Sequence, residues 1–171
     1  MKYCPCRMPV ILAAALAFGA SGVALADDGL LNRNLNLHVY GVSYHTDREG
    51  SRRAGLNNEL NPGLGLNYIL HEDERGIRFV EAGFYQDSGR HVAKLAGVGY
   101  QYKLYQQWRL GGALALMQSH TYNHGRAFVA PLPILTYDFG RAKVNALYVP
   151  RYGDYNQFAV FGLYLSVPLR Q

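Results

Sequence analysis

The chain has 171 residues, of which 49% are hydrophobic and 17% charged, and its formal net charge at pH 7 is +5. This charge is mild, and no basic block or module of aromatic and basic residues points to a nucleic-acid partner. Both cysteines, Cys4 and Cys6, lie near the N-terminus. The remainder of the chain therefore has neither a disulfide framework nor a thiolate metal site.

Residues 1–26 have the features of an export signal. Lys2 and Arg7 give a positive start, Met8–Ala20 forms an apolar run, and Ala24–Ala26 fits the rule of small residues around a cleavage point. The apolar run is too short to span a membrane comfortably as a helix. We expect cleavage after this segment, which would lower the formal charge from +5 to +3.

The remaining domain, residues 27–171, shows alternation of apolar and polar residues, which is typical of β-strands. Polar connections alternate with tight turns, as in bacterial outer-membrane barrels. We predict an all-β fold, an eight-stranded antiparallel up-and-down transmembrane β-barrel. A soluble, lipocalin-like barrel in the periplasm is the alternative. The predicted strands are Leu35–His45, Gly63–Leu70, Ile77–Tyr85, Val92–Leu104, Trp108–Gln118, Ala127–Phe139, Lys143–Val149 and Phe158–Val167.

Hairpin parity places three chemically interesting residues at one rim. The two termini of an even-stranded barrel lie on the same side, normally the periplasm, so every second connection lies outside. His45 ends the first predicted strand, and Asp87 and Ser88 lie in the connection after the third. All three are expected at the outer rim. His38, seven residues before His45, is expected to face the opposite side of its strand.

A histidine, an aspartate and a serine at one rim suggest acyl transfer. A serine hydroxyl needs a base to take its proton, and an imidazole suits this role near neutral pH. A carboxylate can orient the imidazole and stabilise its charged form. Asp87 and Ser88 are neighbours, so a turn must bring both inward. The alternative is ordinary turn chemistry, in which the two side chains bond nearby N–H groups.

The segment Phe84–Tyr100 (FYQDSGRHVAKLAGVGY) contains Asp87 and Ser88 and the predicted strand that follows them. It resembles the Asp-Ser segment and the following strand of the lipid A palmitoyltransferase family of outer-membrane enzymes. Tyr44–Glu49 and Asn58–Leu66 resemble its catalytic-histidine strand and the Gly-rich strand after the first external loop. Pro131–Ile134 and Leu147–Pro150 resemble its Pro-Leu-Pro and Tyr-x-Pro elements. The resemblance covers most of the predicted barrel.

The resemblance implies that His45, Asp87 and Ser88 are catalytic. It also implies that Gly99 is the floor of an acyl-chain pocket, because a missing side chain leaves room for the end of a hydrocarbon chain. A glycine that the barrel requires for steric reasons is the alternative at this position.

Three prolines, by the same resemblance, form a lateral gate for lipid. Pro131, Pro133 and Pro150 cannot donate to a strand ladder, so they weaken barrel closure locally. Prolines at the edges of loops are the alternative interpretation.

The resulting hypothesis is an outer-membrane acyltransferase. It would move a palmitoyl or similar chain from a glycerophospholipid to lipid A, as a monomer among outer-membrane lipids and without metal or cofactor. One alternative is a lipid A deacylase or esterase. That family carries its His and Ser close together late in the chain, and no such pair follows Phe139. Another alternative is a non-catalytic barrel for adhesion or membrane integrity.

Overall fold

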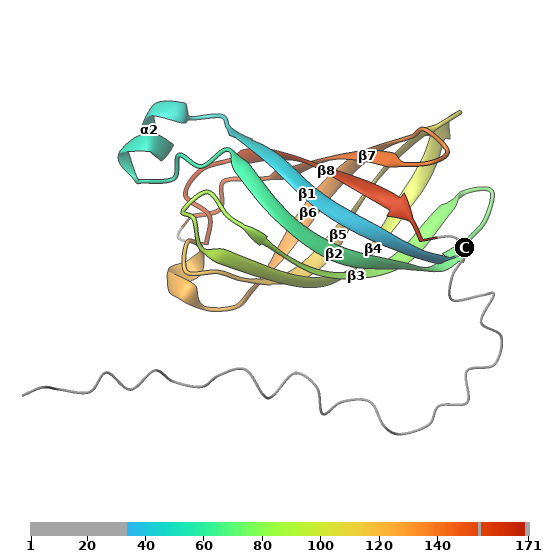
Figure 1. Cartoon of the computed structure of the whole chain (residues 1–171), viewed down its shortest axis with the longest axis horizontal. Coiled ribbons are helices and arrows are strands. Elements are labelled where there is room, and N and C mark those ends of the chain that lie inside the picture. Colours follow the sequence, from blue (N-terminus) through green and yellow to red (C-terminus); the bar gives the residue numbers. More distant parts are fainter. Residues whose placement is uncertain (1–33, 154, 170–171) are drawn as a thin grey trace, which may run out of the picture.

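The computed structural model describes residues 34–153 and 155–169, which form a closed β-barrel (Figure 1). Consecutive strands pair antiparallel, and β1 pairs with β8 to close the barrel. The predicted fold class, an all-β eight-stranded up-and-down barrel, is confirmed. The proposed export signal lies outside the described residues. The strands are β1 (Leu35–His45), β2 (Leu60–Glu72), β3 (Gly76–Gln86), β4 (Val92–Tyr105), β5 (Trp108–Gln118), β6 (Phe128–Asp138), β7 (Lys143–Val149) and β8 (Val160–Pro168).

The predicted strand limits agree with the structure at β1, β5 and β7 and differ by a few residues elsewhere. The first long connection also contains a short helix, α2 (Arg48–Arg53), which the sequence did not predict. Asp47 caps this helix by accepting the Gly50 N–H at 2.8 Å. No helix within residues 34–153 and 155–169 is long and apolar enough to cross a bilayer.

The barrel has two unlike ends (Figure 1). One end, here called the loop end, carries α2, the connections 87–91 and 119–127, and residues 150–153 and 155–159. The other, here called the turn end, carries the short connections 73–75, 106–107 and 139–142. His45, Asp87 and Ser88 all lie at the loop end, as hairpin parity predicts.

A β-bulge at Gly41 corrects one prediction. The register of β1 shifts between Tyr40 and Val42 against both neighbouring strands. An extra residue in a strand reverses the alternation of its side chains beyond that point. His38 and His45 are consequently both buried, with 3% and 5% exposure. The expectation that His38 faces the opposite side from His45 was wrong, because strict alternation cannot account for a bulge.

The outward face of the barrel is apolar, and its interior holds many polar side chains. Leu64, Val98, Leu114 and Leu163 are exposed on strands, whereas the side chains of Asn67, Gln101, Thr136 and Asn145 are buried in the interior. A soluble barrel of the lipocalin type would have a polar outer surface instead. The observed arrangement is consistent with an outer-membrane protein.

The interior near the turn end is filled by hydrogen-bonded polar side chains. The Gln101 amide donates to the Thr136 hydroxyl at 2.7 Å, and this hydroxyl donates to Asn145 Oδ1, also at 2.7 Å. Asn145 Nδ2 in turn donates to Ser166 Oγ at 2.8 Å. This chain crosses four strands, so it closes the turn-end half of the barrel as a polar plug.

Candidate functional site

Asp87 and Ser88 occupy a tight turn that buries both side chains, at 0% and 3% exposure. The Asp87 carbonyl accepts the Arg90 N–H at 3.0 Å, and Arg90 adopts a left-handed conformation with φ of 64°. The Asp87 Oδ1 atom accepts the N–H groups of Gly89 and His91 at 3.0 and 2.9 Å. The turn chemistry is therefore present, and it brings both adjacent side chains inward.

Ser119 completes this cluster from the neighbouring connection. It lies directly after β5, is 3% exposed, and donates a short hydrogen bond from Oγ to Asp87 Oδ2. The Ser119 oxygen also accepts the Thr121 N–H at 3.1 Å. Asp87 thus bonds to two loops of the loop end. The sequence reasoning missed Ser119, although hairpin parity already placed it at the same rim as Asp87.

Two asparagines near the start of β2 hold the Asp87–Ser88 turn from the other side. Asn58 donates from Nδ2 to the Asp87 carbonyl at 3.0 Å and from its backbone to the Ser88 carbonyl at 3.2 Å. Asn61 donates to the Gln86 carbonyl at 2.9 Å. The position of Ser88 is therefore fixed by backbone contacts, while its hydroxyl makes no hydrogen bond with the described residues.

His45 ends β1 with its side chain turned into the barrel, where it is 5% exposed. Among residues 34–153 and 155–169, no hydrogen bond joins its ring to Asp87, to Ser88 or to another side chain. The Asp87 carboxylate is engaged by its own turn and by Ser119. The contact by which Asp87 would orient the His45 ring, expected from the chemistry of the three residue types, is thus not formed in this structure.

A narrow apolar cavity runs into the barrel from Ser88. Leu95, Met117, Leu132 and Leu147 line its walls, and the ring of Tyr40 lies farther along β1 from the rim. The free space is about 60 Å³, which is roughly the volume of two water molecules in liquid. A bound hydrocarbon chain would therefore have to displace flexible lining side chains such as Met117.

Several polar groups on the cavity wall have no partner among the described residues. These are the Ser43 hydroxyl, the Asn61 Oδ1 atom and the Tyr40 hydroxyl. Tyr122 from the connection after β5 also lines the cavity. Burial and the nearby Asp87 carboxylate raise the pKa of Tyr122 to about 12, so its phenol keeps its proton at neutral pH. The wall can therefore offer hydrogen-bond donors to a carbonyl oxygen.

Gly99 lies inside the barrel but does not line this cavity. A Cβ atom there would overlap the Phe79 ring and lie 2.7 Å from the Gly112 carbonyl oxygen. Close packing thus accounts for the glycine. Its role as the pocket floor stays a prediction, because Tyr40 and Tyr164 line the inner end of the cavity in this structure.

The predicted gate prolines lie beside a break in strand pairing. The ladder between β6 and β7 runs from Asp138 only as far as the pair Ile134 and Leu147. Pro131 and Pro133 belong to the part of β6 that pairs with β5 alone, and Pro150 follows β7 directly. A lateral gap in the loop-end half is thus present in the backbone pairing.

Among the described residues, no group of three or more His, Cys, Asp or Glu side chains is placed to hold a metal ion. No model of a known protein family and no curated protein matches the chain. The site must therefore be interpreted from its own geometry.

Proposed function

We propose that this protein is an outer-membrane acyltransferase that moves a palmitoyl or similar chain from a glycerophospholipid to a hydroxyl of lipid A. The observation that carries the proposal is the position of Ser88, a buried hydroxyl that lines an apolar cavity inside the barrel. Acyl transfer requires a reacting group beside a space that can hold a hydrocarbon chain in one orientation.

The distribution of aromatic side chains supports a membrane location. Barrels of the outer membrane carry aromatic residues at both membrane–water interfaces. Outward-facing aromatic residues lie here near the loop end and again near the turn end, with apolar aliphatic residues between them. The loop-end group is Tyr44, Phe84, Tyr148 and Phe161, and the turn-end group is Tyr102, Trp108, Tyr137 and Phe139.

The proposed reaction exchanges one ester for another. His45 takes the proton of the attacking hydroxyl while a bond forms to the ester carbonyl carbon. The bond to the glycerol oxygen breaks, and this oxygen receives the proton, which leaves a lysophospholipid. Where Ser88 is the attacking group, the lipid A hydroxyl repeats the exchange and releases the serine. Asp87 acts by holding the Ser88 turn.

The cavity wall supports the stabilisation of charge on the carbonyl oxygen. The Ser43 and Tyr122 hydroxyls are donors on the wall that Ser88 shares. Donors aimed at a developing oxyanion contribute strongly in a site without bulk water. The His45 ring must approach Ser88 for this chemistry, and catalytic hydrogen bonds commonly tighten when substrate binds.

The gap between β6 and β7 supports a route for lipid from the side. Leu132 and Leu147 line the cavity and come from the two strands whose pairing ends there. A phospholipid chain that passes between these strands would reach the cavity without crossing the polar rim.

Mass spectrometry of lipid A from Gram-negative cells tests the proposal. Expression should add one acyl mass to lipid A and produce lysophospholipid, and the Ser88→Ala variant should abolish both. Ser51→Ala, a buried serine in α2 away from the cavity, is the matched control and should retain the gain. No gain under membrane stress, or an unchanged gain in Ser88→Ala, would contradict the proposal. A loss of acyl mass would indicate a deacylase.

A further inference from the structure

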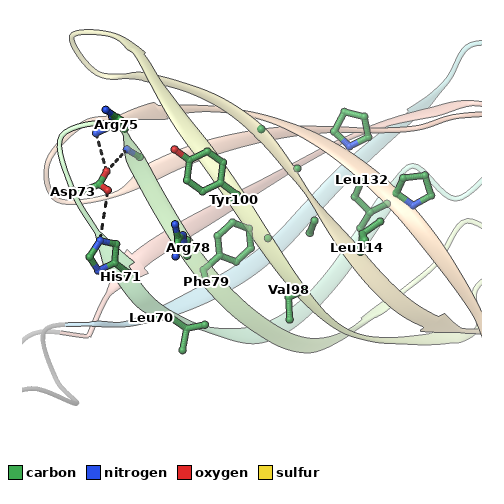
Figure 2. A pocket seen from close by; sticks show the side chains of 17 residues that line it. Leu70, His71, Asp73, Arg75, Arg78, Phe79, Val98, Tyr100, Leu114 and Leu132 are labelled. Atoms are coloured by element: carbon green, nitrogen blue, oxygen red, sulfur yellow. Dashed lines mark hydrogen bonds and ion pairs between the residues drawn. The ribbon is translucent and has the colours of Figure 1, made fainter.

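A second hollow of lipid size lies on the outside of the barrel. It is a groove of about 920 Å³ across the outward faces of β2 to β6 (Figure 2). Gly112, which pairs with Tyr100 of β4 and Pro133 of β6, is one of the residues that line it. A Cβ atom at Gly112 would lie 2.7 Å from the Leu132 carbonyl oxygen. A side chain at this position would therefore be crowded by the backbone of β6.

The groove is apolar along most of its length and charged at one end. Val98, Leu114 and the prolines of β6 form its apolar part. Arg75 and Arg78 stand at its turn end together with His71 and Asp73, as Figure 2 shows. An apolar slot with a cationic end has the chemistry that recognises an anionic amphiphile.

Arg78 is the informative residue of this groove. It is exposed on the outward face of β3, between His71 of β2 and Tyr100 of β4. An arginine facing lipid is costly at the middle of a bilayer and tolerated near the headgroups. Arg78 lies two residues beyond the start of β3 at Gly76, which is about 7 Å along a strand. This position fits the level of the headgroups.

The nearby acid does not neutralise the arginines. Asp73 accepts the backbone N–H groups of Arg75 and Gly76 at 2.8 and 2.9 Å, and it lies 3.5 Å from His71 Nε2. These backbone bonds hold the pKa of Asp73 below its usual value. Its carboxylate is engaged within its own turn. Neither the Arg75 nor the Arg78 guanidinium pairs with a carboxylate among the residues that the structure describes.

We propose that this groove binds one membrane glycerophospholipid, with its phosphate on Arg78 and Arg75 and an acyl chain along Val98 and Leu114. Tyr100 would cover the glycerol region, because its hydroxyl lies beside the Gly76 backbone at the turn end. The site is on the opposite side of the barrel wall from the Ser88 cavity. The inference rests on the membrane location proposed above and does not depend on acyl transfer.

Native mass spectrometry of the purified full chain in detergent tests this site, with dioleoyl phosphatidylglycerol as the probe. The protein should retain one lipid. Arg78→Gln should weaken binding about fivefold, because the attraction of one arginine to an anionic lipid changes the binding constant by about that factor. Arg141→Gln is the matched control, because Arg141 is exposed in the connection between β6 and β7 at the same end. Dioleoylglycerol and inorganic phosphate, each alone, should bind far more weakly.

A second variant tests the apolar part of the groove. Leu114→Asn should also reduce lipid retention, and circular dichroism should show that its barrel has folded. Unchanged binding in Arg78→Gln, an equal loss in Arg141→Gln, or equal binding of dioleoylglycerol would overturn the site. Ser88→Ala should retain the lipid, so a failure of the proposed acyl transfer would leave this result intact.

Discussion

The two halves of the barrel interior differ in how their buried polar groups are satisfied. In the turn-end half, a continuous chain of hydrogen bonds joins Gln101, Thr136, Asn145 and Ser166, and only single nitrogens of His38 and Arg109 lack a hydrogen-bond partner among the described residues. In the loop-end half, polar atoms of Tyr40, Ser43 and Asn61 face a narrow apolar cavity and have no partner among the described residues. The same strands therefore build two kinds of interior.

The difference indicates which half is available to a ligand. A buried polar group without a partner costs about 1–3 kcal/mol, so such groups call for an explanation. A satisfied network gives rigidity instead. The turn-end half thus acts as a fixed plug, and the loop-end half keeps the Tyr40 and Ser43 hydroxyls, which can donate to a substrate ester.

The largest expected effect comes from replacing each of the two buried histidines of β1 by alanine. His45→Ala should reduce acyl transfer by about 10²–10⁴-fold, the usual contribution of a general base. His38→Ala should leave transfer within about tenfold, but it removes the ring whose Nδ1 lies 3.6 Å from Glu81 Oε2. Loss of this buried ring, whose centroid lies 4.9 Å from that of Tyr164, leaves a cavity that should cost about 3 kcal/mol of stability. Transfer assays and urea unfolding of both variants measure the contrast.

The contrast would fail if His38→Ala lost transfer as completely as His45→Ala while both barrels stayed folded. The chemistry would then lie deeper in the barrel than Ser88.

A smaller effect, on stability, should distinguish the hydrogen-bonded network of the turn-end half from the cavity wall of the loop-end half. Thr136→Val removes two hydrogen bonds from a fully buried network and should cost about 1–3 kcal/mol. Ser43→Ala removes a hydroxyl without a partner, so stability should hardly change. Transfer by Ser43→Ala should still fall by about 10²-fold if this hydroxyl meets the ester oxygen. Equal losses of stability in the two variants would erase the distinction.

The next effect concerns the depth of the cavity: a shallower cavity should favour transfer of shorter acyl chains. Gly162→Leu places a side chain in the cavity, where a Cβ atom would lie 3.2 Å from the flexible Leu147 side chain. Each methylene excluded from the cavity should reduce transfer about fourfold, from about 0.8 kcal/mol of burial. Gly99→Ala should instead cost about 1–3 kcal/mol of stability by overpacking against Phe79. Lipid A mass spectra report chain length, and shorter chains with Gly99→Ala would identify Gly99 as the floor.

Alternation and hairpin parity were enough to predict most of the fold and the rim of the site. The limits of β1, β5 and β7 followed from sequence because polar or turn-forming residues bound each strand. The bulge at Gly41 could not be predicted from the sequence, because one inserted residue leaves no compositional signal. It changed the side on which His38 lies.

The partners of Asp87 were also beyond sequence reasoning. Ser119 belongs to a different connection, and only the folded loops bring its hydroxyl to the carboxylate. The unpartnered state of Ser43 likewise depends on the packing of its neighbours. The sequence could indicate which residues share a rim, and the structure was needed to show which of them bond.

The smallest expected effect concerns the turn end, at the connection between β2 and β3. The pKa of the exposed Asp73 carboxyl lies below 3.8 because two backbone N–H groups bind its charged form. The charged group therefore stabilises the fold above that unfolded-state value, and the stabilisation is lost as pH falls through the lower folded-state pKa. The difference in urea midpoint between wild type and Asp73→Ala should be constant near neutral pH and shrink below about pH 4. Glu74→Ala, a neighbouring carboxylate without such bonds to described residues, should show a smaller change. A difference that grows on acidification would mean that this turn is held by other contacts.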